Sequence, residues 1–365
     1  MKKAVYLLLL LLISCKVKNV NSPVSYQFFV GTYTNGDSEG IYKYSISNEG
    51  KLSFVGLQAK TNNPSFLAKT IDNKTLLAVD ETEEDGTGFV KSYKITKDTL
   101  LYKSKSKSGG AHPCFVSVKN NQVLVANYSG GSIGYLKIDD KNGLTNLLDL
   151  QQHFGKGTTE RQQKPHAHSA WFHPKTNEII AVDLGTNELW FSSIDKQDNF
   201  IFSEIQQKLK MQDGAGPRHL TFHPNNNWIY VLNELDNTVS LIKKEGNMYV
   251  VSSSISTLPK SFTKLSNGAD IHISKDGEFL YASNRGHDSI VIYKANSQDG
   301  LLELVGFETV KGKNPRNFSL TPDDNFLVVA NQDTNNLISF KRDLKTGKLI
   351  FIDEIKAANP VCVLF

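Results

Sequence analysis

Residues 219–235, HLTFHPNNNWIYVLNEL, predict a β-hairpin, because two alternating apolar runs flank a turn rich in proline and asparagine. Residues 317–333, NFSLTPDDNFLVVANQD, repeat this pattern. Each hairpin opens on a similar short motif, GPRHL at residues 216–220 and NPRNF at residues 314–318. Self-similarity of this kind indicates a repeat protein, and the period of the repeat then decides the fold.

The opening motif recurs along the chain at intervals of about 49 residues, in the range of propeller blades. Its seven copies are NPSFL (63–67), HPCFV (112–116), HAHSA (166–170), GPRHL (216–220), GADI (268–271), NPRNF (314–318) and NPVCV (359–363). Each repeat offers alternating segments for further strands, and no convincing amphipathic helix interrupts them. We therefore predict an all-β protein, a seven-bladed β-propeller with four antiparallel strands per blade.

The two ends of the chain complement each other. The last repeat stops after one strand at residues 361–365, whereas three strands without such a partner open the chain at residues 26–34, 40–47 and 52–59. We expect these segments to share one blade, so that pairing of the N- and C-terminal strands closes the ring and removes open sheet edges. A sandwich or a two-domain fold explains neither the period nor the half-blades. Residues 26–365 are therefore predicted to form a single domain.

The first fifteen residues have the features of an export signal. Lys2 and Lys3 precede an apolar run that is too short to span a membrane comfortably, and the segment ends in LISC at residues 12–15. This ending resembles the lipobox of bacterial lipoproteins, in which the cysteine carries the lipid. We expect residues 1–15 to be a lipoprotein signal peptide with Cys15 lipidated, and residues 16–25 to be a polar tether. The alternative is a plain secretory signal with an incidental cysteine.

The expected location follows from this signal: an exported, membrane-anchored bacterial lipoprotein that faces the periplasm. The formal net charge of +4 falls by two without Lys2 and Lys3, so no nucleic-acid partner is expected, and no membrane contact beyond the anchor. We expect a monomer. Cys114 and Cys362 remain after lipidation of Cys15, and the sequence leaves open whether they form a disulfide.

Hairpin spacing places several polar side chains at one rim of the propeller channel. Arg218 lies eight residues before the turn centre at Asn226 and Glu234 lies eight after it, so we expect them to be cross-strand neighbours. The same spacing of 16 links His168 with Leu184, Ala269 with Arg285, Arg316 with Gln332 and Ser65 with Glu81. Single charges at strand ends are usually solvated, but equivalent positions in adjacent blades favour a small-ligand site.

The segment PHAHSAWFHP at residues 165–174 contains three histidines with different expected places. His168 occupies the rim position in its blade that Arg218 occupies in the following blade, whereas His166 either faces the same pocket or supports a loop. His173 and the corresponding His223 begin hairpin turns and are interpreted as turn residues. His112, His219, His272 and His287 are expected to be structural or rim residues. No metal and no cofactor are expected, because only His166 and His168 form a close pair and the nearby arginines would repel a cation.

With these residues placed, the chain resembles the lactonase family of seven-bladed propellers, which includes bacterial 6-phosphogluconolactonases and fungal carboxy-muconate cyclases. The resemblance covers the whole mature chain and rests on these motifs: FVGTYT (29–34), GIYKY (40–44), NPSFL (63–67), HPCFV (112–116), ANYSGGSI (126–133), PHAHSA (165–170), GPRHLTFHP (216–224), LNEL (232–235), SNRGHDSI (283–290) and NPRNFSLTP (314–322). It implies a site built from His168, with His166 as the other candidate, and from Arg218, Glu234 and Arg285.

The resemblance implies lactone chemistry, which needs a base for water and donors for the oxyanion. Glu234 or His168 can be the base, and Arg218 and Arg285 the donors. Because Arg218 should lower the pKa of Glu234, we expect His168 to be the better proton shuttle.

Three further residues are expected to bind the substrate: Arg316, which suits an anionic group, with His166 and Gln332. The resulting expectation is hydrolysis of a small anionic sugar lactone, similar to that by 6-phosphogluconolactonases in carbohydrate metabolism. A muconate-type cycloisomerase and a non-catalytic binding propeller remain alternatives.

The anchor expectation can be tested by metabolic labelling with a fatty-acid probe. The wild-type protein should be labelled and the Cys15→Ser variant should not, because the thiol is the expected site of lipid attachment. Equal labelling of the two proteins would contradict the lipobox interpretation.

Overall fold

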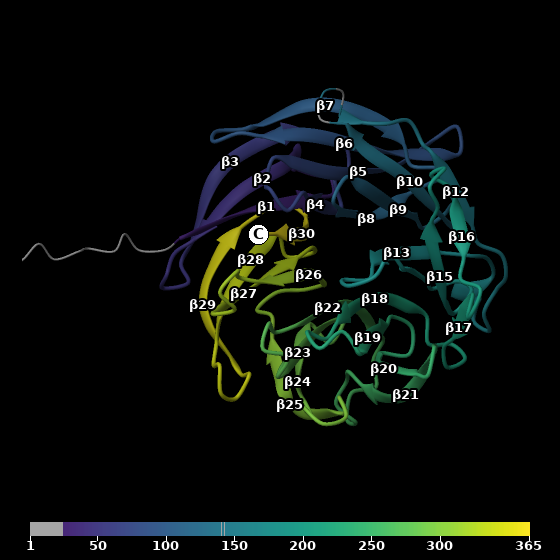
Figure 1. Ribbon diagram of the computed structural model, residues 1–365. Helices are drawn as coiled ribbons and strands as arrows, with labels where there is room; N and C mark the ends of the chain where they lie inside the picture. Colours follow the sequence, from purple (N-terminus) through teal and green to yellow (C-terminus); the bar gives the residue numbers. More distant parts are fainter. Residues whose placement is uncertain (1–24, 140, 142) are drawn as a thin grey trace, which may run out of the picture.

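A computed structural model describes residues 25–139, 141 and 143–365, and within them seven antiparallel sheets are arranged in a ring around a central axis (Figure 1). The predicted seven-bladed β-propeller is therefore confirmed. The signal segment, Cys15 and nearly all of the tether lie outside the described residues. No helix in the described part of the chain is long and apolar enough to cross a membrane.

Each blade has four strand positions, counted from the channel outward. Blade 1 contains β30 (Pro360–Leu364), β1 (Tyr26–Thr32), β2 (Gly40–Ile46) and β3 (Leu52–Lys60). Blade 2 contains β4 (Leu67–Lys69), β5 (Thr75–Glu84), β6 (Thr87–Ile95) and β7 (Leu100–Lys107). Blade 3 contains β8 (Pro113–Lys119), β9 (Gln122–Asn127), β10 (Ser132–Asp139), β11 (Gly143–Leu144) and β12 (Asp149–Gln152). In blade 3, β11 and β12 both pair with β10 and so share the outer position.

Blade 4 contains β13 (Ala167–Phe172), β14 (Ile179–Asp183), β15 (Glu188–Ile194), β16 (Phe200–Phe202) and β17 (Lys208–Lys210). Blade 5 contains β18 (Pro217–Phe222), β19 (Trp228–Asn233), β20 (Thr238–Glu245) and β21 (Met248–Ser256). Blade 6 contains β22 (Asn267–Ile273), β23 (Phe279–Arg285), β24 (Ser289–Ala295) and β25 (Leu302–Thr309). Blade 7 contains β26 (Pro315–Leu320), β27 (Phe326–Asn331), β28 (Asn336–Arg342) and β29 (Leu349–Lys356). One short 3₁₀ turn, η1 (Glu160–Gln162), lies between β12 and β13.

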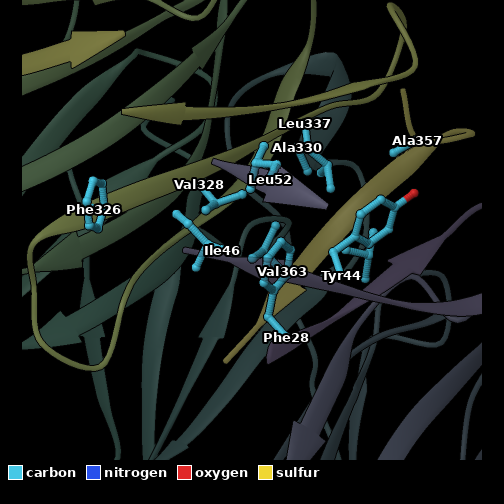
Figure 2. Close-up of a cluster of buried hydrophobic side chains, with 11 residues drawn as sticks. Phe28, Tyr44, Ile46, Leu52, Phe326, Val328, Ala330, Leu337, Ala357 and Val363 are labelled. Carbon is cyan, nitrogen blue, oxygen red and sulfur yellow. The ribbon is translucent and has the colours of Figure 1, made fainter. Parts of the chain in front are cut away.

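The ring is closed by the chain ends, as predicted. Strand β30 pairs with β1, with Val363 opposite Val30, so blade 1 contains both termini of the domain (Figure 1). Side chains of blade 1, including Phe28, Tyr44 and Val363, pack with Val328 and Ala330 of blade 7 in one buried cluster (Figure 2). Closure therefore buries an apolar interface between the first and last blades in addition to its main-chain hydrogen bonds.

The inner strands share a bulge near the channel mouth. In blade 5, Pro217 pairs with Asn233 and His219 pairs with Leu232, so Arg218 is an extra residue in the ladder. His168 in β13, Arg316 in β26, Cys114 in β8 and Val361 in β30 are extra residues in the same way. A bulge turns the extra side chain out of the normal alternation, and here each of these residues lies at the same level of its blade.

The bulge corrects the predicted register. Glu234 was expected to lie directly opposite Arg218, but its backbone N–H donates to Gly216 O, two residues earlier. Likewise Arg285 pairs with Asn267 rather than with Ala269. The expected pairs assumed an unbroken hairpin, whereas the extra residue in each inner strand shifts the register at the mouth.

Ring closure predicts that a buried charge on β30 is far more harmful than one on an outer strand. Val363→Asp would place an unpaired carboxylate in the interface between blades 1 and 7, and we expect the melting temperature to fall by roughly 5 °C or more. The matched control is Ile350→Asp, because Ile350 is 56% exposed on β29. Similar melting temperatures for the two variants in thermal unfolding would contradict the closure.

Candidate active site

Three arginines hold the carboxylate of Glu234 in the described structure. Arg161 Nη2 donates to Oε1 at 2.9 Å, and Arg285 Nη2 lies 2.9 Å from Oε2. Arg218 Nε lies 3.1 Å from Oε2 as an ion pair, although its N–H is not aligned for a hydrogen bond. The structure thus brings together Arg218, Glu234 and Arg285, which the sequence placed at one rim, and adds Arg161, which the sequence analysis missed.

The charges around Glu234 decide its protonation. Burial of the side chain opposes ionisation, but Arg285, Arg218 and Arg161 outweigh it and lower the pKa of Glu234 to about 2. The direction agrees with the expectation from Arg218 alone. Burial, with repulsion from Arg285, also lowers the pKa of Arg218 to about 10, so this guanidinium remains charged at neutral pH. The site therefore contains a permanently ionised carboxylate surrounded by cations.

Backbone carbonyls of β22 orient two of these arginines, Arg218 and Arg285. Arg218 Nη1 donates across the blade boundary to Ala269 O, and Arg285 Nη2 donates at 2.9 Å to Gly268 O within blade 6. Gly268 borders the β22 bulge, and Ala269 lies within it, between Gly268 and Ile271. Strand β22 therefore supplies the acceptors that orient one arginine from β18 and one from β23.

Arg161 comes from the long connection between β12 and β13, which contains η1. Its neighbour Gln162 is fully buried and donates from Nε2 to Leu184 O at 2.8 Å and to Asn187 Oδ1 at 3.1 Å. The Gln162 Oε1 atom accepts from the backbone N–H of Thr159, which closes the turn. A Thr-x-x-Gln capping pattern in a long loop was the sequence signal that could have revealed this ordered segment.

His166 is a half-buried, neutral histidine whose tautomer is set by its surroundings. Its Nδ1 lies 3.0 Å from Tyr128 O, and because a carbonyl only accepts, Nδ1 carries the proton. The ring stacks on Tyr128, with centroids 4.4 Å apart, and Nε2 makes no hydrogen bond with the described residues. Burial lowers the pKa of His166. Its Nε2 is therefore an unprotonated nitrogen available to a ligand.

The position of His166 depends on a close backbone approach. Its backbone N–H donates to Asp183 Oδ1 at 2.9 Å, and the Gly185 backbone passes directly beneath the same segment. A Cβ atom at Gly185 would lie 1.9 Å from Lys164 O and 2.6 Å from His166 N. A side chain at residue 185 is therefore excluded unless the segment that carries His166 moves.

His168 lies deeper than expected for a solvent-facing rim residue. It is 5% exposed, its Nδ1 lies 3.7 Å from Cys114 Sγ, and its ring touches Tyr128 and His219 edge-on. Burial, followed by repulsion from Arg218, lowers the pKa of His168 well below its ordinary value. His168 is therefore a neutral side chain in the channel wall.

Arg316 contacts Tyr33 in blade 1. Its Nη2 donates to Tyr33 Oη at 2.8 Å, and Tyr33 in turn donates to Glu81 Oε2 at 2.9 Å. Ser65 also donates to Glu81, which agrees with the expected proximity of these two residues. Among the described residues, no hydrogen bond joins Gln332 to this group: its backbone N–H donates to Asn314 O, and its buried Oε1 has no hydrogen-bond partner.

The charges of these two clusters do not balance. Within the described residues, four arginines, Arg161, Arg218, Arg285 and Arg316, accompany three nearby carboxylates, Glu234, Glu81 and Asp270, which leaves one positive charge in excess. Arg218 and Arg316, with Ser65 and Cys114, also line a small cavity of about 10 Å³, which is about the room needed for one water. The excess positive charge suits an anionic ligand.

The turn histidines lie where the sequence placed them. His173 Nδ1 accepts from the backbone N–H of Thr176 at 3.2 Å, and His223 Nδ1 accepts from that of Asn225 at 3.1 Å. Both therefore stabilise the hairpin turns. Among the described residues, no group of three or more His, Cys, Asp or Glu side chains is arranged to hold a metal.

This fold and this site define a known class. The chain belongs to the lactonase, 7-bladed beta-propeller family, whose model matches residues 27–365. It is 37% identical over 345 residues to the 6-phosphogluconolactonase of Bacillus subtilis, across 92% of this chain and 97% of that protein.

Solved structures agree with this assignment. A protein from Lactobacillus plantarum shares 31% identity with a TM-score of 0.88, covering 94% of this chain and 99% of its own. The periplasmic gluconolactonase of Pseudomonas aeruginosa shares 28% identity with a TM-score of 0.88, covering 93% of this chain and 98% of its own. The family resemblance inferred from the motifs is therefore confirmed.

The arginine cluster predicts an anion-dependent stability for Glu234→Gln. The neutral amide leaves three guanidiniums without their counter-charge, so the melting temperature should fall, equivalent to about 3 kcal/mol. Added phosphate or sulfate should raise the melting temperature of this variant more than that of wild type, because the anion replaces the carboxylate. Glu303→Gln, which removes an exposed carboxylate on β25, is the control. An equal response of all three proteins would contradict the charge argument.

The same variant has a pH signature. The pKa of Glu234 in the folded protein, about 2, lies below its ordinary value of 4.5, so its contribution to stability is complete above pH 4.5. That contribution is lost as the pH falls toward 2. The difference in melting temperature between wild type and Glu234→Gln should therefore be constant at neutral pH and shrink in acid.

Proposed function

We propose that the protein hydrolyses an anionic or polyhydroxylated sugar lactone at the channel mouth. The observation that carries this proposal is a neutral histidine with a free Nε2, His166, beside an arginine cluster with excess positive charge. Lactone hydrolysis needs these two components, a base for water and donors for the carbonyl oxygen. The names of the Bacillus and Pseudomonas relatives support the same class of reaction.

The base in this proposal is His166 rather than His168 or Glu234. A carboxylate with a pKa of about 2 is a weak base, and its three arginine partners already occupy its oxygens. His168 is enclosed by Cys114, Tyr128 and His219, and gaining a proton there is opposed by burial and by Arg218. His166 keeps its proton on Nδ1 through Tyr128 O and offers Nε2 to a water molecule.

The arginines supply electrostatic stabilisation. Arg161 and Arg285 are the accessible donors, with side chains 50% and 16% exposed, while Arg218 is 4% exposed and supports them from within the wall. As water attacks the lactone carbonyl, its proton passes to His166 Nε2, and the carbonyl oxygen becomes an oxyanion held by the guanidiniums. The ring C–O bond then breaks, and the departing alkoxide oxygen recovers that proton, which yields the hydroxy acid.

The role of Glu234 is to hold the arginines in place. Like charges at this separation repel, and the carboxylate lets Arg161, Arg218 and Arg285 converge on one point. Arg316, whose described side-chain hydrogen bond goes to the neutral Tyr33 hydroxyl, is free to pair with a carboxylate or phosphate of the substrate. Gln332 is not needed for this arrangement.

The proposed location of the protein narrows the range of possible substrates. If the N-terminal segment directs export and Cys15 carries lipid, the protein meets lactones outside the cytoplasm, where phosphorylated intermediates of glucose metabolism are not formed. We propose aldonolactones or acidic sugar lactones made outside the cytoplasm as the substrates.

The proposal is tested by lactone hydrolysis on the purified protein, corrected for spontaneous opening. His166→Gln should reduce kcat by about 10² or more, since it removes the general base. Wild-type activity should fall as the pH drops through the lowered pKa of His166, below 6.5, and this acid limb should vanish in the variant. His173→Ala, at a turn, should lower stability while leaving the kcat of folded protein unchanged. If the wild type binds sugar lactones without opening them, the protein is a binding propeller instead.

A further inference from the structure

A second buried carboxylate, Asp270, adjoins the site without contacting Glu234 in the described structure. Asp270 lies in the bulge of β22, is 3% exposed, and accepts at Oδ1 from His219 Nδ1 at 2.8 Å. Its Oδ2 accepts from His272 Nε2 at 2.9 Å and from Asn317 Nδ2 at 2.5 Å. Three side chains from three blades thus converge on one carboxylate.

The hydrogen bond from His219 to Asp270 determines which nitrogen of His219 faces Arg218. Burial opposes ionisation of Asp270, but His272 and His219 outweigh it and hold the pKa of Asp270 well below its usual range. The ionised carboxylate only accepts, so His219 Nδ1 carries a proton. Burial and Arg218 lower the pKa of His219 to about 4, so the ring is neutral and Nε2 is an acceptor. This Nε2 lies 3.3 Å from Arg218 Nη1.

The His219 ring is enclosed and cannot easily turn to present a different edge. It is 2% exposed and makes edge-on contacts with four aromatic rings. These rings and their centroid distances are Phe66 at 5.7 Å, Phe115 at 5.5 Å, Trp171 at 6.3 Å and His168 at 5.4 Å. Close packing of this kind holds a side chain in one orientation.

We propose that Asp270 is a positioning residue for the site: it fixes His219 as the Nδ1–H tautomer, and His219 Nε2 then orients Arg218. Arg218 Nη1 has two hydrogens, and the two acceptors next to it are His219 Nε2 and Ala269 O. With both hydrogens used, the guanidinium plane is fixed and Nε is left facing Glu234. The effect that we expect on the kinetics of lactone hydrolysis rests on the proposed function, but the assignment of the His219 tautomer does not.

The variant Asp270→Asn should reverse which atoms donate and which accept in the hydrogen bonds that link residue 270, His219 and Arg218. Oδ2 of Asp270 faces two side-chain donors, His272 Nε2 and Asn317 Nδ2, so the amide oxygen of an asparagine belongs on that side. The amide NH2 then faces His219 Nδ1, which must become the acceptor, and the proton moves to Nε2. Nε2–H and Arg218 Nη1–H would be two donors facing each other, and the guanidinium must turn away.

The direct test is the histidine tautomer, read from nitrogen-15 NMR of the labelled full-length protein. Wild-type His219 should be neutral with the proton on Nδ1, and Asp270→Asn should move the proton to Nε2 and shift the Arg218 Nε–H signal. An Nε2–H tautomer or an imidazolium in the wild type would overturn the proposal. This wild-type measurement stands even if Asp270→Asn fails to fold, or if no lactone is hydrolysed.

The kinetic test separates positioning from stability. Asp270→Asn should reduce kcat/KM for the lactone at least about tenfold, because a misoriented Arg218 displaces Glu234 and its partners. The matched control is His272→Gln, which keeps a donor for Oδ2 and leaves the His219 edge untouched. The His272→Gln variant should lose similar stability in thermal unfolding but keep the wild-type kcat/KM. Equal kinetic losses in the two variants would show that the cluster only stabilises the fold.

Discussion

Pairing of β30 with β1 is the constraint on which the rest of the structure depends, because it turns a row of blades into a closed ring with a channel. The closing strand also reaches the site through side chains. Val363 N–H donates to Asn317 Oδ1 at 2.6 Å, and Asn317 donates to Asp270. From Asp270 the contacts continue through His219 and Arg218 to Glu234. Closure of the ring and orientation of the arginines are therefore parts of one network of hydrogen bonds and ion pairs.

A cluster of like charges in a channel is normally unfavourable, and the bulged inner strands explain how it is held here. Each bulge presents an extra residue, such as Arg218 or Arg316, at the same level of its blade. At the bulge of β22, the backbone carbonyls of Gly268 and Ala269 accept from Arg285 and Arg218.

The fold was predictable because its signals are periodic. Seven motif copies and the matching half-blades specified the ring, and the hairpin spacing placed Arg218 near Glu234 and Arg285. The predicted strand register at the channel mouth was wrong because the alternation of apolar and polar residues within a strand gives no sign of a bulge. Arg161 was missed because it lies in a loop, where no period exists and the chain is fixed by individual hydrogen bonds such as those of the buried Gln162. The different environments of His166 and His168 depend on contacts with Tyr128 and Cys114, residues distant in sequence.

The two thiols in the described residues have a consequence for where such a protein can fold. Cys114 and Cys362 are buried and unpaired, so the domain does not use a disulfide between them. Burial raises the pKa of Cys362 to about 12 and that of Cys114 further still, and a protonated, enclosed thiol reacts slowly with oxidants. The ring therefore gains nothing from an oxidising environment and loses nothing in a reducing one. The contacts of the described domain therefore do not depend on oxidation of these two thiols.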